Sequence, residues 1–177
     1  MACIGGRFAR GAGRAAAAMT ALMILAPLLA RAAEVVALGA DYTQGEGVAP
    51  TETYPAQLEA MLRAKGFAVA VANAGVSGDT TAGMLSRFDS VVDSSTRVLA
   101  LQPGYNDESS GISNEDAAAN VIRIVVAASA RHIKVVMVRR KLYYKLPRQG
   151  DNIHLTPEGN HSLAALLLPQ VVSALGK

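Results

Sequence analysis

The chain has 177 residues, a length typical of one domain, with 17 Lys and Arg against 14 Asp and Glu. Residues 1–32 hold four of the basic residues and no acidic ones, so the remainder carries 13 basic and 14 acidic residues, and the overall positive charge does not argue for nucleic-acid binding. The one cysteine, Cys3, lies in the same segment, which excludes disulfides and cysteine-based metal sites from the rest of the chain.

The N-terminal segment has the organisation of a secretory signal peptide. Three arginines precede the apolar run 15–30, and Ala30 and Ala32 are the small residues of a cleavage site. An uncleaved membrane anchor is the weaker alternative, because the run is short and contains Pro27, whereas a span needs about 20 residues. We therefore expect cleavage near Ala32, export to the periplasm or out of the cell, no stable membrane span afterwards, and a single domain at 33–177.

Short apolar runs then alternate with amphipathic stretches. In chain order we expect a strand at 34–38, a helix at 54–66, a strand at 67–75, a helix at 80–92, a strand at 96–104, a helix at 114–130 that starts at Ser113, a strand at 133–138 and a last helix from Thr156. The helical spacing turns these apolar residues inward: Leu58, Met61 and Leu62; Met84, Leu85, Phe88 and Val92; Val121, Ile124, Val125 and Ala128; Leu163, Leu166, Leu167 and Val171. Pro169 is expected to bend or shorten the last helix.

This alternation predicts an α/β fold: three α/β/α layers around a mostly parallel, flavodoxin-like sheet. In such sheets the working groups gather at the carboxyl ends of the strands. Polar loops follow all four strands, with the sequences "GADYTQG", "NAGVSGDTTAG", "PGYND" and, after a basic stretch, "GDNIHLTPEG". We therefore expect the four loops to form one site.

Together the four loops resemble the SGNH, or GDSL, family of esterases and lipases, and are most similar to its small exported arylesterases, thioesterases and lysophospholipases. The matching positions, in order between Val35 and about Leu175, are the glycines and Thr43 of the first loop, Gly78, then Gly104-Tyr105-Asn106-Asp107 for Gly-x-Asn-Asp, and Asp151-Asn152-Ile153-His154 for Asp-x-x-His. Each block alone is weak, because such residues are common in turns, but four in order are specific.

The resemblance implies a role for each matched residue. His154 would be the general base and Asp151 would orient its ring. The backbone N–H groups of Asp41 and Gly78 and the side-chain amide of Asn106 would form an oxyanion hole. No metal or organic cofactor is required, and the substrate would be a small-molecule ester, thioester or lipid. The structural alternatives are a turn role for Asn106 and Asp107, a positive φ for Gly78, a capping or packing role beneath the last helix for His154 and an ordinary loop position for Asp151.

The departure from the family is at the nucleophile. Asp41 stands where the family has its serine, and Ala40 stands where it has aspartate. A carboxylate is a weak nucleophile toward esters and puts negative charge beside the developing oxyanion. Loss of the serine in a related triad costs roughly 10⁶ in kcat.

Three interpretations stay open: a family member that has lost efficient hydrolysis and keeps a ligand cleft, an enzyme that uses Asp41 as a base or as an altered nucleophile, or an ordinary esterase in which Asp41 is an introduced residue. The corresponding functions are an ester hydrolase of impaired or altered activity, or an exported non-catalytic binding protein for a small acyl or glycan ligand. An ionised Asp41 near His154 should titrate with it as a coupled pair and favour the imidazolium.

The basic segment 139–150 has two interpretations: contact with an anionic lipid or acyl phosphate, or a solvated connection containing a brief fifth strand. His132 and His161 are expected at the surface. The chain has neither a Walker phosphate loop nor G-x-G-x-x-G after its first strand, which argues against nucleotide binding. The sequence leaves the oligomeric state open.

Overall fold

The structure is a computed structural model that describes residues 1–2 and 33–176. Apart from its first two residues, the predicted signal peptide lies outside the described residues. The sheet consists of β1 (Val35–Gly39), β2 (Val71–Gly75), β3 (Val98–Leu101) and β4 (Lys134–Met137). All neighbouring strands are parallel and their order is β2-β1-β3-β4, which confirms the predicted parallel sheet.

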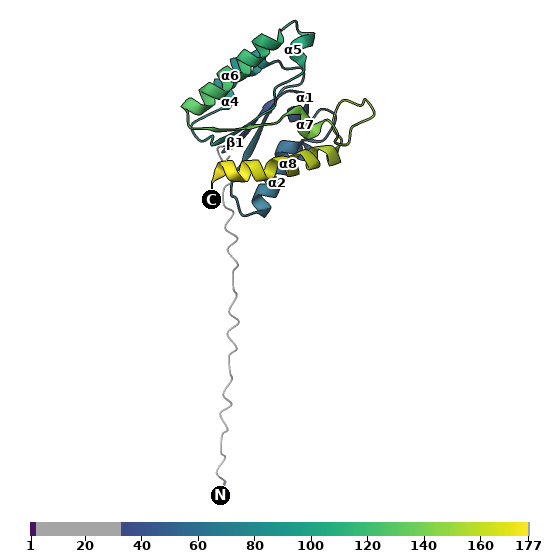
Figure 1. Ribbon diagram of the computed structural model, residues 1–177. Helices are drawn as coiled ribbons and strands as arrows, with labels where there is room; N and C mark the ends of the chain where they lie inside the picture. The colour runs from purple at the N-terminus through teal and green to yellow at the C-terminus, as the bar shows by residue number, and fades with distance from the viewer. Residues whose placement is uncertain (3–32, 177) are drawn as a thin grey trace.

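Helices cover both faces of this sheet (Figure 1). The longer ones are α2 (Tyr54–Ala64), α3 (Thr81–Ser86), α6 (Asn114–Ala130) and α8 (Pro157–Leu175). The short ones are α1 (Asp41–Gln44), the 3-10 helix η1 (Pro50–Glu52), α4 (Phe88–Val91), α5 (Asn106–Ser109) and α7 (Arg140–Tyr143). Among the described helices, none combines the length and apolar character needed to cross a membrane.

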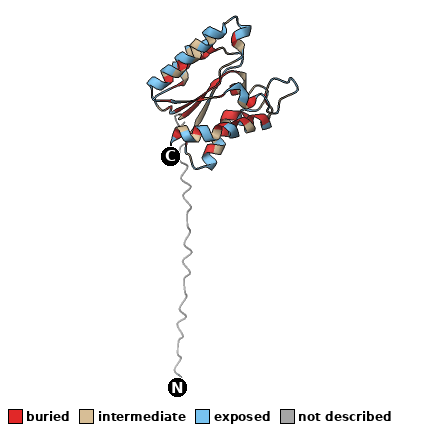
Figure 2. Ribbon diagram, in the orientation of Figure 1, coloured by how far each residue is buried: buried red, intermediate tan, exposed pale blue. Residues whose placement is uncertain are grey.

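The alternation of side chains along each strand divides the core into two layers. Val35 and Ala37 of β1 pack with α2 and α8, whereas Val36 and Leu38 pack with α3, α4 and α6. Figure 2 shows the same division, with the buried sides of the helices facing a buried sheet. The predicted three-layer α/β/α architecture is therefore confirmed.

Some details of the helices differ from the prediction. The expected helix at 80–92 is divided into α3 and α4 at Arg87, whose side chain turns inward to bond three separate segments. Pro169 lies inside α8, and the helix continues past it to Leu175. Leu166, expected to face inward, is exposed. The helix starts agree better, because Thr80, Ser113 and Thr156 each accept a hydrogen bond from a backbone N–H of the first turn.

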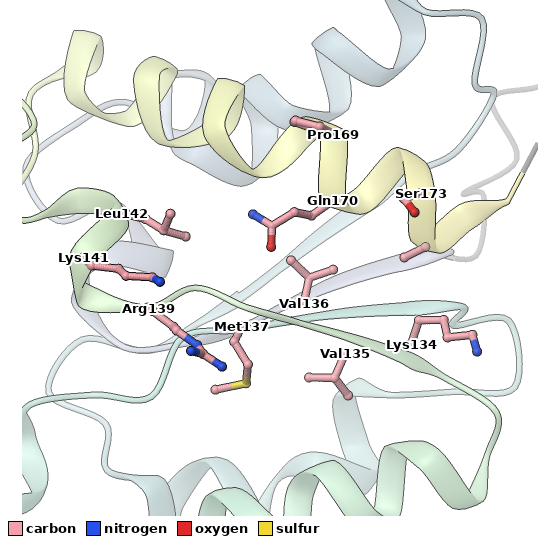
Figure 3. A pocket seen from close by; sticks show the side chains of 11 residues that line it. Lys134, Val135, Val136, Met137, Arg139, Lys141, Leu142, Pro169, Gln170 and Ser173 are labelled. Carbon is pink, nitrogen blue, oxygen red and sulfur yellow. The ribbon is translucent and has the colours of Figure 1, made fainter.

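The predicted fifth strand in 139–150 is wrong. The chain forms α7 there, and its only pairing in the described residues is an isolated antiparallel bridge between Arg148 and Leu155. As a result β4 is an edge strand, and a groove of about 970 Å³ runs along it between α7 and α8 (Figure 3). Lys134, Arg139 and Lys141 line this groove together with apolar side chains.

Candidate active site

A smaller pocket of about 570 Å³ lies at the carboxyl end of the sheet. It is lined by Asp41, Asn106 and His154 together with tyrosines from three segments of the chain. None of the site residues predicted from sequence lines the larger groove along β4. We therefore take the smaller pocket as the candidate site, because it contains the predicted site residues and the larger groove does not.

The first wall of the pocket is the turn that holds Asp41, and a buried glutamine fixes it. Gln102, at the end of β3, accepts hydrogen bonds at Oε1 from the Ala40 N–H (3.0 Å) and from the Thr43 hydroxyl (3.1 Å). Thr43 also contacts the buried Tyr54 hydroxyl at 3.2 Å. A Cβ at Gly39 would lie 2.1 Å from Thr43 Oγ1, so only glycine permits this approach. Position 41 is thus held rigidly at the mouth of the pocket.

The Asp41 carboxylate is surrounded by hydrogen-bond donors. Its Oδ1 accepts from the Ser77 hydroxyl at 2.7 Å and from the Gly78 N–H at 3.1 Å, and its Oδ2 accepts from the Asn106 side-chain amide at 3.0 Å. Partial burial raises the pKa of Asp41, but the hydrogen bonds from Asn106, Ser77, its own backbone N–H and Gly78 outweigh it, so the pKa lies below its ordinary value. The side chain is therefore held as an anion.

In this chain the predicted oxyanion donors have the Asp41 carboxylate as their acceptor. Gly78 and Asn106 both donate to the Asp41 side chain, and the Asp41 N–H also favours its charge. Gly78 has φ of +74°, and an added Cβ would meet no atom within 4 Å, so this position needs glycine for its backbone conformation. The three donors converge on a pair of oxygens that the protein itself supplies.

The opposite wall carries Asp151 and His154. Asp151 Oδ2 lies 2.6 Å from His154 Nδ1, and Oδ1 accepts from the N–H groups of Ile153 (2.8 Å) and His154 (3.0 Å). Hydrogen bonds from the Ile153 backbone and the His154 ring lower the pKa of Asp151 to about 2. Within the described residues, His154 Nε2 makes no hydrogen bond, and none joins His154 to Asp41.

The loop with Asp151 and His154 is attached to the turn around Asp41. The Tyr42 hydroxyl donates to the Ile153 carbonyl at 2.9 Å and accepts from Arg148 at 2.8 Å. Gln149 bridges the carbonyls of Glu46 (2.7 Å) and Leu155 (2.9 Å). The His154 ring lies 6.5 Å from the Tyr42 ring, centroid to centroid. These contacts place His154 in the pocket beside the residue that follows Asp41.

Two residues beneath the pocket support this site: Arg87, which no sequence pattern indicated, and Asp107, which was indicated only as part of the Gly-x-Asn-Asp block. Arg87 pairs with Asp79 at 2.8 Å and donates to the carbonyls of Ala74 (2.8 Å) and Gly39 (3.1 Å), so it joins the ends of β1 and β2. Asp107 is buried and accepts from the Thr81 N–H (3.0 Å) and hydroxyl (2.6 Å). Apart from Asp79, their partners lie 13 to 48 positions away in sequence, and no local pattern indicates these contacts.

The other histidines lie away from the pocket. His132 is exposed at the end of α6 with φ of 60°, and His161 is exposed on α8 with its ring 3.1 Å from Gln57 Oε1. Within residues 33–176, no group of three or more His, Asp or Glu side chains is placed to hold a metal ion.

Comparison with known proteins gives a consistent assignment. The model of the GDSL-like lipase/acylhydrolase family matches residues 37–165, which include every predicted site residue. No curated protein matches the chain.

Solved structures share the fold. The TesA crystal structure has a TM-score of 0.71 at 18% identity over 79% of this chain and 98% of that one. Psychrotrophic esterase EstA from Pseudoalteromonas sp. has a TM-score of 0.69 at 15% identity over 81% and 98%. AlinE4, an SGNH-hydrolase family esterase, has a TM-score of 0.56 at 28% identity over 81% and 74%. By sequence and by architecture, the chain belongs to the GDSL-like lipase/acylhydrolase family.

Proposed function

We propose that this chain keeps the acyl-ester site of its family in a form that binds small esters, thioesters or lipid-derived acyl groups but is blocked in hydrolysis by Asp41. One observation carries the proposal: the Asp41 carboxylate accepts hydrogen bonds from Ser77, Gly78 and Asn106. In keeping with the predicted signal peptide, we propose that it acts in the periplasm or outside the cell.

The chemistry of ester hydrolysis explains why this contact blocks turnover. A serine at position 41 would attack the ester carbonyl while His154 Nε2 takes its proton, and Asp151 would stabilise the resulting imidazolium. The carbonyl oxygen would become an oxyanion held by the N–H groups of residues 41 and 78 and by Asn106. Asp41 removes the hydroxyl and also supplies an anion that competes for the same donors.

A direct catalytic role for Asp41 has less support. A general base works best when its pKa lies near the working pH, whereas hydrogen bonds hold the pKa of Asp41 below its ordinary value. Both carboxylate oxygens also accept hydrogen bonds, which lowers their nucleophilicity toward a carbonyl.

The test compares turnover of p-nitrophenyl acetate and a short thioester by the natural protein, Asp41→Ser, Asp41→Ala and Asp41→Asn. Asp41→Ala is the matched control, because it releases the donors without supplying a nucleophile. We expect kcat/KM of Asp41→Ser to exceed that of Asp41→Ala by roughly 10³-fold or more.

Two results would contradict the proposal. Equal kcat/KM for Asp41→Ser and Asp41→Ala would show that the remaining residues do not form a working triad, and would favour a purely ligand-binding protein. Turnover by the natural protein that is lost in Asp41→Asn would show that the carboxylate itself takes part in catalysis.

A further inference from the structure

Two arginines line the candidate pocket, and their surroundings differ. Arg148 donates to the Tyr42 hydroxyl at 2.8 Å and to the carbonyls of Ile153 and Tyr144, so its guanidinium holds the loop of Asp151 and His154 in place. Arg140, the first residue of α7, makes no side-chain hydrogen bond or ion pair within the described part of the chain. Its Cζ lies 4.8 Å from the centre of the Tyr105 ring.

Neither Asp41, which lines the pocket, nor the nearby Asp151 forms an ion pair with Arg140. Asp41 is engaged by Ser77, Gly78 and Asn106, and Asp151 is engaged by His154 and two backbone N–H groups. The guanidinium of Arg140 therefore keeps its five N–H donors for a ligand or for water. Among the described residues that line this pocket, it is the one cation without a protein acceptor.

The contact with Tyr105 fixes where this cation lies. Tyr105 directly precedes Asn106, whose amide lies at the reacting end of the pocket. A guanidinium over an aromatic ring is held by the ring's negative face and still presents its N–H edge outward. Arg140 thus adds a cationic wall to a pocket of about 570 Å³, a size that suits a small ligand.

We propose that Arg140 selects esters or thioesters that carry an anionic group, a carboxylate or a phosphate, in addition to the bond to be cleaved. The anionic group pairs with the Arg140 guanidinium while the acyl carbonyl lies against Asn106 and Gly78. This inference rests on the proposed function, and it names the class of substrate for the same site.

The neighbouring Arg139 provides a matched control. It has the same charge and is also exposed, but its side chain lies among the residues of the groove along β4 (Figure 3) and outside the candidate pocket. Arg139→Gln and Arg140→Gln thus remove one positive charge each from adjacent positions, and only the second removes it from the pocket. Thermal unfolding of both variants checks that the fold is kept.

The kinetic arm uses the Asp41→Ser background with two matched pairs of esters. The first is 4-nitrophenyl adipate monoester against 4-nitrophenyl 6-methylheptanoate, in which an isopropyl group replaces the carboxylate. The second is an acetyl ester of glycerol 3-phosphate against the acetyl ester of glycerol. The charge lies on the acyl side in the first pair and on the alcohol side in the second, so the two pairs distinguish a substrate with an acyl-side carboxylate from one with an alcohol-side phosphate.

We expect Arg140→Gln to lower kcat/KM for one charged ester about ten- to hundredfold, mainly through a higher KM, because a hydrogen bond to a charged group is lost. The neutral partner should change less than twofold, and Arg139→Gln should leave both esters of that pair within twofold. Added salt should reduce the preference for the charged ester. Equal effects of the two arginine variants, or an unchanged ratio of charged to neutral ester in both pairs, would overturn the inference.

A binding arm separates this inference from the proposed function. Chemical-shift titration of the natural protein with adipate and with glycerol 3-phosphate, against adipamide and glycerol, needs no turnover. If Asp41→Ser hydrolyses none of the esters, the proposed function fails, and weaker anion binding by Arg140→Gln than by Arg139→Gln still supports the anion site. Equal binding by both variants, or no preference for the anions, overturns it.

Discussion

The two walls of the candidate pocket differ in how far their chemistry is already used within the protein. On the wall formed by the ends of β1, β2 and β3, the donors Ser77, Gly78 and Asn106 all bind the Asp41 carboxylate. On the opposite wall, Asp151 orients His154 through Nδ1, and within the described residues Nε2 makes no hydrogen bond. The hydrogen-bond donors of the first wall are satisfied by the protein itself, and we call it the satisfied wall. The second, where His154 Nε2 is available to a ligand, is the open wall.

This difference shows how one substitution can change the function of a site without disturbing its structure. The position of residue 41 is set by Gly39, Gln102 and Thr43, and the donors around it are largely backbone groups or fixed amides. A carboxylate fits this set of donors because it resembles the oxyanion they are suited to bind. We therefore expect the two walls to respond differently when residues are changed.

The largest effect is expected on the open wall. In the Asp41→Ser background, His154→Ala should lower kcat/KM for p-nitrophenyl acetate by roughly 10³-fold or more, because the serine loses its base. Steady-state kinetics of the two variants measures this loss. His161→Ala is the matched control and should have no effect, because His161 lies on the surface beside Gln57. A small loss in His154→Ala would show that the open wall takes no part in catalysis.

The next effect belongs to the satisfied wall. In the same background, Asn106→Ala should lower kcat by roughly 10²–10³-fold, the usual value of one oxyanion donor, with a smaller change in KM. Asn106 also donates to the Asp79 carbonyl at 3.0 Å, so Asn106→Asp, which keeps the shape but loses the donor, is measured beside it. Full activity in both variants would mean that this amide is not an oxyanion donor.

A third prediction concerns stability beneath the satisfied wall. Arg87→Ala should lower the free energy of unfolding by about 2–3 kcal/mol, because it leaves the largely buried Asp79 without its partner and two carbonyls without a donor. The control Arg63→Ala breaks an exposed i,i+4 pair with Glu59 and should cost less than about 1 kcal/mol. Urea denaturation measures both values, and equal losses would contradict the assigned role of Arg87.

The smallest expected effect is the dependence of stability on pH. The pKa of Asp41 and that of Asp151 both lie below their ordinary values in the folded protein. The unfolded chain therefore binds more protons in acid, and the stabilisation from these carboxylates is present above their ordinary pKa and is lost as the pH falls through their folded-state pKa values, which for Asp151 is about 2. The slope between pH 2 and 5 should be shallower in Asp151→Asn, and an unchanged slope would contradict the lowered pKa of Asp151, to which the Ile153 N–H and the His154 ring both contribute.

Sequence patterns predicted the parts of this molecule that depend on local periodicity and order. The β-branched runs gave the buried strands, the caps at Ser113 and Thr156 gave helix starts, and the polar loops behind the strands indicated which residues meet at one edge of the sheet. The position of Asn106 next to Asp41 follows from that rule, because β1 and β3 are adjacent.

The remaining features depend on contacts between distant segments. Gln102 bonds residues about 60 positions earlier, and Arg87 bonds Gly39, so neither partner can be inferred from neighbouring residues. Segment 139–150 contains apolar and aromatic residues that suit a strand, but Tyr143 packs against Tyr42 with ring centroids 4.5 Å apart, and the chain turns into α7. Ser77 could have been identified from the sequence, because its hydroxyl is next to Gly78 and can donate to the same anion.

The central claim is that the Asp41 carboxylate lies within the donors of an otherwise complete ester site. A ¹³C NMR titration of the Asp41 carboxyl group tests it most directly, in the natural protein and in Ser77→Ala and Asn106→Ala. We predict a pKa below 3.8 in the natural protein that rises in each variant as a donor is lost. A pKa at or above 3.8 in the natural protein, with no change in either variant, would contradict the claim.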